Sequence, residues 1–150
     1  MKPLLLTNAL IINEGKRTQA DILIDKGRID KISPIIIAQP NWQVIDISGK
    51  WVIPGMIDDQ VHFREPGLTH KGTIASESRA AVMGGVTSFM EMPNVTPPTT
   101  SRLALREKFQ RASRSSLANY SFYFGVTNDN LDEFTALMPD EACVVKAFMG

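Results

Sequence analysis

The chain has 150 residues, a hydrophobic content of 43% and no formal net charge at pH 7. This length is sufficient for one hydrophobic core, and the balanced charge gives no indication of a nucleic-acid or membrane partner. The sequence has no apolar run of the roughly 18 residues that a membrane span requires, and its first residues lack the apolar core and cleavage site of a signal peptide. A cytoplasmic protein is therefore expected.

The first part of the chain predicts a small β domain, because short apolar runs alternate there with turn residues. Lys26-Gly27 is typical of a hairpin turn, since glycine readily takes positive φ. Residues 1–53 are accordingly predicted to form the amino-terminal part of a composite β-sandwich. The expected strands are Leu4 to Asn13, Ile22 to Asp25, Arg28 to Ile32, Gln43 to Ile47 and Trp51 to Ile53.

After Pro54-Gly55 the pattern changes to strands that alternate with helices. Strands are expected over 57–62, 86–91, 120–126 and 143–149, and helices over 74–83 and 101–114. A third helix is expected from an N-cap at Asp129 to just before Pro139. The alternation predicts an α/β fold with a parallel sheet. The strand starts recur about every 23 to 34 residues, as in a (β/α)8 TIM barrel.

Residues 54–150 are therefore predicted to be the first four βα units of such a barrel. An open half barrel would expose strand edges and an apolar face, so the remaining units are expected beyond residue 150. Cys143 lies in the last of these strands and is the only cysteine, which excludes a disulfide within the chain. We interpret it as a small packed residue rather than a nucleophile.

The most informative stretch is residues 58–67, where an apolar strand ends in His62 and Arg64. Residues two apart on a strand lie on the same face. A neutral imidazole is a suitable zinc ligand, and a guanidinium binds a carboxylate through two parallel hydrogen bonds. Alone, His62 would more often be a structural residue and Arg64 a surface ion-pair partner of Glu65. Together they predict a metal beside a carboxylate-binding group.

Two further positions carry chemistry. Asn94 lies in a turn between Pro93 and Pro97, where it could donate to the same carboxylate or be a simple turn residue. Lys146 lies among apolar residues, in a strand expected to be buried on both faces. An unpaired ammonium is costly there. Either the aliphatic part of the Lys146 side chain extends so that its ammonium reaches the rim of the sheet, or the amine is uncharged.

Three motifs in this order resemble the dihydroorotases of the amidohydrolase superfamily. The first is similar to the family pattern Pro-Gly-x-Ile-Asp-x-His-x-His-x-Arg-Glu-Pro-Gly. The others are Gly84-Gly85-Val86-Thr87 leading to Met-Pro-Asn at 92–94, and Val-Lys-Ala-Phe-Met-Gly at 145–150. The resemblance implies the reversible hydrolysis of L-dihydroorotate to N-carbamoyl-L-aspartate in pyrimidine biosynthesis.

The resemblance also implies a site. His62 and a carboxylated Lys146 would bind one or two zinc ions, and Arg64 and Asn94 would bind the carboxylate of the substrate. The catalytic aspartate is expected later in the chain. Asp58 would support the metal ligands, whereas Asp59 points away from His62. The expected partner is a small-molecule substrate, and the expected assembly is a homodimer.

Gln60 departs from the family pattern, because it occupies the position of the first histidine. An amide oxygen is a weaker zinc ligand than an imidazole nitrogen. An enzyme with an altered site, a single-metal enzyme and a protein without catalysis remain open. The presence of Arg64, Asn94 and Lys146 favours activity.

Three other interpretations compete with a dihydroorotase. Allantoinases and dihydropyrimidinases share the barrel, but the former tend to have an extra residue before the asparagine and the latter lack the arginine. A dihydroorotase-like scaffold would lack metal and turnover. A basic nucleic-acid surface on the second helix is disfavoured, because its cations are expected on a solvated face without aromatic residues between them. They are Arg102, Arg106, Lys108, Arg111 and Arg114. His70 is expected to be exposed and not a ligand.

Overall fold

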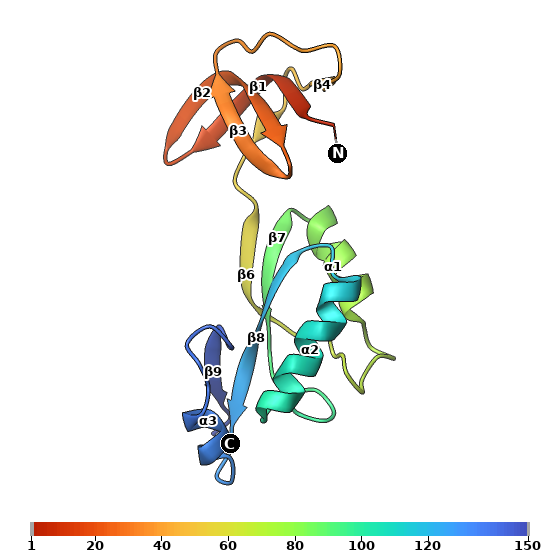
Figure 1. Cartoon of the computed structure of the whole chain (residues 1–150), viewed down its shortest axis with the longest axis vertical. Helices are drawn as coiled ribbons and strands as arrows, with labels where there is room; N and C mark the ends of the chain where they lie inside the picture. Colours follow the sequence, from red (N-terminus) through yellow and green to blue (C-terminus); the bar gives the residue numbers. More distant parts are fainter. Residues whose placement is uncertain (1, 150) are drawn as a thin grey trace. The chain divides into compact units, whose positions relative to one another are not determined.

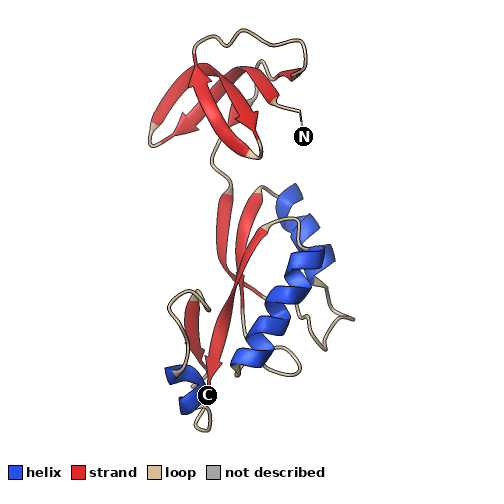
Figure 2. Ribbon diagram, in the orientation of Figure 1, coloured by secondary structure: helices blue, strands red, loops and turns tan. Residues whose placement is uncertain are grey.

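A computed structural model describes residues 2–149, which divide into two compact units with the boundary between Pro54 and Gly55 (Figure 1). The first unit is built from strands, and the second combines strands with helices (Figure 2). In the described part of the chain, no helix is long and apolar enough to cross a membrane.

The first unit is a mixed five-stranded sheet with the order β3-β2-β1-β4, in which β5 also pairs with β1. Neighbours β1, β2 and β3 are antiparallel, whereas β4 and β5 run parallel to β1. Lys26 and Gly27 have φ values of 49° and 76°, as a two-residue hairpin turn requires. The strands are β1 Leu4–Asn13, β2 Lys16–Asp25, β3 Arg28–Ser33, β4 Gln43–Asp46 and β5 Trp51–Val52.

Strand β2 begins six residues earlier than the sequence predicted, at Lys16 instead of Ile22. Its polar first half pairs with apolar β1, so that Thr18 lies opposite Ile11. A preceding turn at Glu14 and Gly15, both with positive φ, makes this pairing possible. In residues 2–54 the structure describes one sheet, so the second layer of the expected β-sandwich stays a prediction.

The second unit contains a parallel sheet with the order β6-β7-β8-β9. This confirms the βαβ pattern that the sequence predicted and gives a curled parallel half-barrel. Helices α1 and α2 connect successive strands (Figure 1). The elements are β6 Met56–Val61, α1 Ile74–Met83, β7 Val86–Glu91, α2 Arg102–Ser115, β8 Asn119–Val126, α3 Leu131–Thr135 and β9 Val144–Ala147.

The core of this unit lies between the sheet and the two longer helices, which cover one face of the sheet (Figure 2). Aromatic rings dominate it, and the centroids of Phe63 and Phe89 are 4.4 Å apart. Helix α2 places Leu105 and Ala112 against these rings. Their burial fixes which face of the sheet the helices cover, because the hydrophobic effect favours the largest loss of apolar surface.

Helix α1 starts with a capping box, in which Thr73 and Ser76 satisfy each other's backbone N–H groups. Glu65 adds a third contact, since its Oε2 accepts from the backbone N–H of Ile74 at 2.8 Å. The helix ends at Gly84-Gly85, as predicted, and Gly85 has a φ of 89°. The N-terminus of α1 is thereby fixed to the segment that follows β6.

The third helix is shorter than predicted. It covers only Leu131–Thr135, and its N-cap is Asn130 rather than Asp129. The side chain of Asn130 does not cap the helix, because its Oδ1 accepts from the backbone N–H of Thr127 while its Nδ2 donates to the carbonyls of Thr100 and Gly125. The backbone N–H of Met138 donates to Glu141 rather than to a helical carbonyl. The helix therefore ends well before Pro139.

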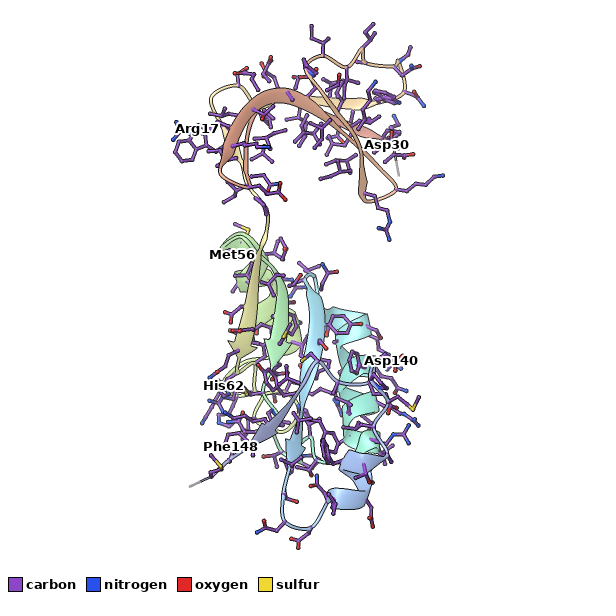
Figure 3. All side chains as sticks on the ribbon, turned by 90° about the vertical axis from the view of Figure 1, so that its left-hand side faces the viewer. Arg17, Asp30, Met56, His62, Asp140 and Phe148 are labelled. Carbon is purple, nitrogen blue, oxygen red and sulfur yellow. The ribbon has the colours of Figure 1, made fainter. Side chains whose placement is uncertain are left out.

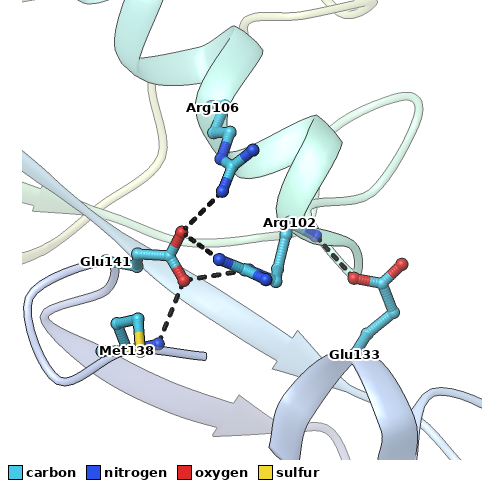
Figure 4. A network of polar contacts seen from close by, with 5 residues as sticks. All are labelled: Arg102, Arg106, Glu133, Met138 and Glu141. Atoms are coloured by element: carbon cyan, nitrogen blue, oxygen red, sulfur yellow. Dashed lines mark hydrogen bonds and ion pairs between the residues drawn. The ribbon is translucent and has the colours of Figure 1, made fainter. Parts of the chain in front are cut away.

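Glu141 is the centre of a polar network that joins α2 to the segment before β9 (Figure 4). Arg102 Nη2 lies 2.8 Å from Glu141 Oε1, and Arg106 Nη2 lies 3.2 Å from the same oxygen. Hydrogen bonds from Arg102 hold the pKa of Glu141 well below its usual value, at about 2. The carboxylate is thus charged throughout the ordinary pH range.

Candidate active site

The carboxyl ends of β6 and β7 bring three predicted site residues to one end of the sheet. His62 directly follows β6, Arg64 lies two residues further on, and Asn94 follows β7. His62 is exposed, whereas Arg64 and Asn94 are half-buried. Figure 3 shows His62 and Phe148, which follows β9, at the same end of the parallel sheet. Active sites of barrels gather at this end.

His62 and Asn94 are in direct contact, because Nδ1 of the imidazole lies 2.9 Å from Oδ1 of the amide. An amide oxygen can only accept a hydrogen bond, so Nδ1 carries the ring proton when this bond forms. The Nε2 atom of the neutral ring then has a free lone pair. A histidine held in this tautomer by an outer partner is suited to bind a metal ion.

The two segments that carry these residues form one packed unit. We call residues 62–68 the first loop and residues 92–98 the second loop. Met92 N donates to the carbonyl of Val61 at 3.0 Å, and Thr96 N donates to the carbonyl of Pro66 at 3.1 Å. Gly67 packs so closely, at a φ of 81°, that a methyl group there would overlap the Thr96 carbonyl oxygen. A shift of one loop without the other would break these contacts.

A buried ion pair lies beneath both loops. Glu91, at the end of β7, and Lys108, on α2, have side chains that are 0% and 1% exposed, and Nζ lies 3.1 Å from Oε2. Glu91 Oε1 accepts from the backbone N–H of Arg64, and Lys108 Nζ donates to the carbonyl of Met92. Burial raises the pKa of Glu91 and lowers that of Lys108, while their mutual attraction opposes both shifts.

The prediction that Lys108 lies on the solvated face of its helix was therefore wrong. Leu105, Lys108 and Ala112 are all buried on one side of α2. Their spacing of three and four residues was the available signal, because such residues share a helix face. Other basic residues of this helix are also engaged, since Arg102 and Arg106 bind Glu141.

Lys146 occupies a different position from the other site residues. It lies on β9, opposite Gly125 of β8, and two strands separate β9 from β6 in the sheet order. Its Nζ lies 5.4 Å from the centroid of the Phe148 ring. Val144 and Val145 are 45% and 40% exposed, so the expected burial of this strand on both faces is not found in the described chain. Its metal-binding role stays a prediction.

Backbone groups of Gln60 and Asp59 on β6 are hydrogen-bonded to side chains. Gln60 is exposed and its backbone N–H donates to Asp58 Oδ1 at 3.1 Å. The carbonyl of Asp59 accepts from the hydroxyl of Tyr123 at 2.7 Å. His70 is exposed, as predicted, and Cys143 is half-buried.

A zinc ion would find a fitting donor in His62, because Nε2 is left free by the contact with Asn94. Within residues 2–149, no group of three or more His, Cys, Asp or Glu side chains could hold a metal ion. Gln60 and Lys146 offer an amide oxygen and an amine instead. The described residues thus fit part of a zinc site, to which other segments would have to add ligands.

Comparison with known proteins shows the family of this chain. The pattern of the dihydro-orotase-like family matches residues 49–146. Over 91 residues the chain is 52% identical to a dihydroorotase of Carboxydothermus hydrogenoformans, a match that covers 61% of this chain and 21% of that protein. Over 148 residues it is 36% identical to an allantoinase of Deinococcus radiodurans, covering 98% of this chain and 33% of the relative.

Among solved structures, an L-hydantoinase (dihydropyrimidinase) from Arthrobacter aurescens superposes with a TM-score of 0.82 at 32% identity, covering 89% of this chain and 30% of that one. The half-barrel and these matches place the chain in the amidohydrolase superfamily of hydrolases. The chain belongs to the dihydro-orotase-like family. It spans between about a fifth and a third of the length of the relatives it matches.

Proposed function

We propose that this chain is the amino-terminal part of a dihydroorotase, which reversibly hydrolyses L-dihydroorotate to N-carbamoyl-L-aspartate in pyrimidine biosynthesis. The contact between His62 and Asn94, beside Arg64 in the packed loops, carries this proposal. It joins a candidate metal ligand to a candidate substrate-binding residue. The 52% identity to a dihydroorotase supports the choice within the family.

The substrate carboxylate would be bound by Arg64 and Asn94. The guanidinium offers two parallel donors. The Oδ1 atom of Asn94 is occupied by His62, so its Nδ2 is left to donate to the carboxylate. This arrangement would orient the ring of dihydroorotate towards His62. Such positioning would speed the reaction, because less entropy is then lost in reaching the transition state.

Zinc would be held by Nε2 of His62 and by Lys146 as a carbamate, which forms when the neutral amine adds carbon dioxide and releases a proton. A closed (β/α)8 barrel would bring β9 towards β6. When bound, zinc supplies a Lewis acid for the amide carbonyl and an activated water. A later aspartate would transfer the proton. We expect Gln60 to weaken the metal site without removing it.

Two other functions remain as alternatives. The allantoinase match spans 98% of this chain, so an allantoinase is the second candidate. Allantoin has no carboxylate, and Arg64 would then lack the partner proposed for it. A dihydroorotase-like scaffold would purify without zinc and without turnover, because its site would be incomplete.

The test is to express the full-length protein that carries this sequence, and to measure zinc per subunit and turnover of dihydroorotate and allantoin. We expect dihydroorotate turnover that His62→Ala abolishes, and an Arg64→Ala variant whose main defect is a raised KM. Arg114→Ala, an exposed arginine of α2, is the control and should behave like the parent. Turnover of allantoin alone would support the allantoinase, and neither turnover nor zinc would support the scaffold.

A further inference from the structure

We infer that the buried pair Glu91–Lys108 is a positioning element that holds the two substrate-binding loops in one arrangement. The inference rests on the proposed function, because it assigns the pair to the binding of the substrate carboxylate. Neither residue reaches the substrate side of the loops, since both side chains are buried beneath them.

The pair contacts one backbone group in each loop. Oε1 of Glu91 accepts from the N–H of Arg64 at 3.0 Å. Nζ of Lys108 donates to the carbonyl of Met92 at 3.0 Å, two residues before Asn94. The ion pair at 3.1 Å closes a continuous path from the first loop to the second. Displacing either charge would therefore move a backbone that carries a substrate-binding side chain.

The backbone of Arg64 needs such support. Its φ is 70°, in the left-handed region that residues with a side chain rarely adopt. A hydrogen bond to a charged acceptor is stronger than one to a neutral group, so Glu91 can stabilise this conformation. This backbone conformation sets the direction in which the Arg64 side chain leaves the first loop.

Stability alone does not account for the pair. Removing two charges from water costs free energy that their attraction only partly returns, and apolar replacements of such pairs are often neutral or stabilising. Lys108 also lies 5.0 Å from the centroid of Phe122, a site where an apolar residue would pack well. Compared with two apolar residues at these positions, the charged pair adds the hydrogen bonds to the backbones of Arg64 and Met92.

Two double variants of the full-length protein separate these roles. Glu91→Gln with Lys108→Met removes both charges but keeps an oxygen that can accept from Arg64. Glu91→Met with Lys108→Met removes the charges and that oxygen, at similar side-chain length. We expect the KM for dihydroorotate to rise about threefold in the first variant, which loses the contact of Lys108 with Met92, and about tenfold in the second, which also loses the contact of Glu91 with Arg64, with kcat within about twofold of the parent in both. Phe109→Ala, on the same helix and packed against Phe122, is the control for core damage and should leave KM near the parent value.

Amide hydrogen exchange of residues 62–68 and 92–98, measured without substrate, gives a second readout. We expect faster exchange in both loops of the Met/Met variant than in the Gln/Met variant. If the parent does not hydrolyse dihydroorotate, the proposed function fails while this comparison still tests the positioning role. Equal loop exchange in the two variants, or a KM raised equally by Phe109→Ala, would overturn the inference.

Discussion

The imidazole of His62 and the amide of Asn94 share a 2.9 Å hydrogen bond across the ends of two neighbouring parallel strands. Because of this bond, the oxygen and the nitrogen of the Asn94 amide have different roles. Its oxygen fixes the histidine tautomer, and its nitrogen remains available to a substrate. Metal binding and substrate binding are thereby linked through a single side chain.

Asn94→Ala should consequently affect both properties. Removing the outer partner of a metal-binding histidine typically lowers metal affinity about 10- to 100-fold. We expect a loss of that size in zinc affinity, measured by competition with a chelator, together with a raised KM. Asn94→Asp keeps an acceptor for Nδ1 and should retain zinc, while its charge repels the substrate carboxylate. Unchanged zinc affinity in Asn94→Ala would show that the contact does not act on the metal.

Gln60→His should strengthen zinc binding, because it replaces an amide oxygen with an imidazole nitrogen. The measurement is zinc per subunit after dialysis against a graded chelator series. Asp59→His is a suitable control, since neighbouring strand residues point to opposite faces. If both variants bind zinc like the parent, position 60 does not face the metal.

Gly67→Ala should displace the two loops. The alanine would meet the Thr96 carbonyl in a backbone region unfavourable to any side chain. We expect a raised KM and a loss of about 1–3 kcal/mol in the free energy of unfolding. Gly27→Ala is the matched control, because Gly27 has a similar φ of 76° with no atom within 4 Å of an added Cβ. Gly27→Ala should lower the free energy of unfolding without changing KM. A raised KM in Gly27→Ala would show that loop displacement is not the cause of the raised KM in Gly67→Ala.

The network around Glu141 should make stability depend on pH in acid. Because the folded-state pKa is about 2 and the ordinary value is 4.5, the contribution is complete above about pH 4.5 and is lost as pH falls towards 2. We expect Glu141→Gln to be less stable than the parent at pH 6, with a difference that narrows between pH 4.5 and 2. Denaturant unfolding at several pH values measures this. Glu107→Gln, on the exposed face of α2, should show no such narrowing.

Local patterns in the sequence were sufficient for most of the fold of residues 55–149. The strands β6 to β8 and helices α1 and α2 lie within a few residues of their expected positions, because apolar periodicity and the Gly84-Gly85 signal act over short distances. The same patterns put His62, Arg64 and Asn94 at strand ends. The family resemblance, which the match over residues 49–146 confirms, supplied the chemistry.

Non-local contacts produced the differences. Strand β2 extends to Lys16 because β1 supplies partners for its polar half, and α3 ends early because the backbone N–H of Met138 donates to Glu141 instead of to a helical carbonyl. Lys108 is buried because Glu91 comes from a strand seventeen residues away in sequence to pair with it. Charge and polarity predict exposure only when no partner is available, and the only local sign of Lys108's burial was its spacing from Leu105 and Ala112.

The sequence by itself determined which side chains stand at the carboxyl ends of β6 and β7, since alternation and turn residues set the strand limits. Tertiary structure decided how those side chains are held: the His62–Asn94 hydrogen bond, the packing of Gly67 on Thr96 and the ion pair beneath both loops. The reason is physical. The limits of β6 and β7 depend mainly on neighbouring residues, whereas the direction of a side chain depends on the segments that the fold brings against it.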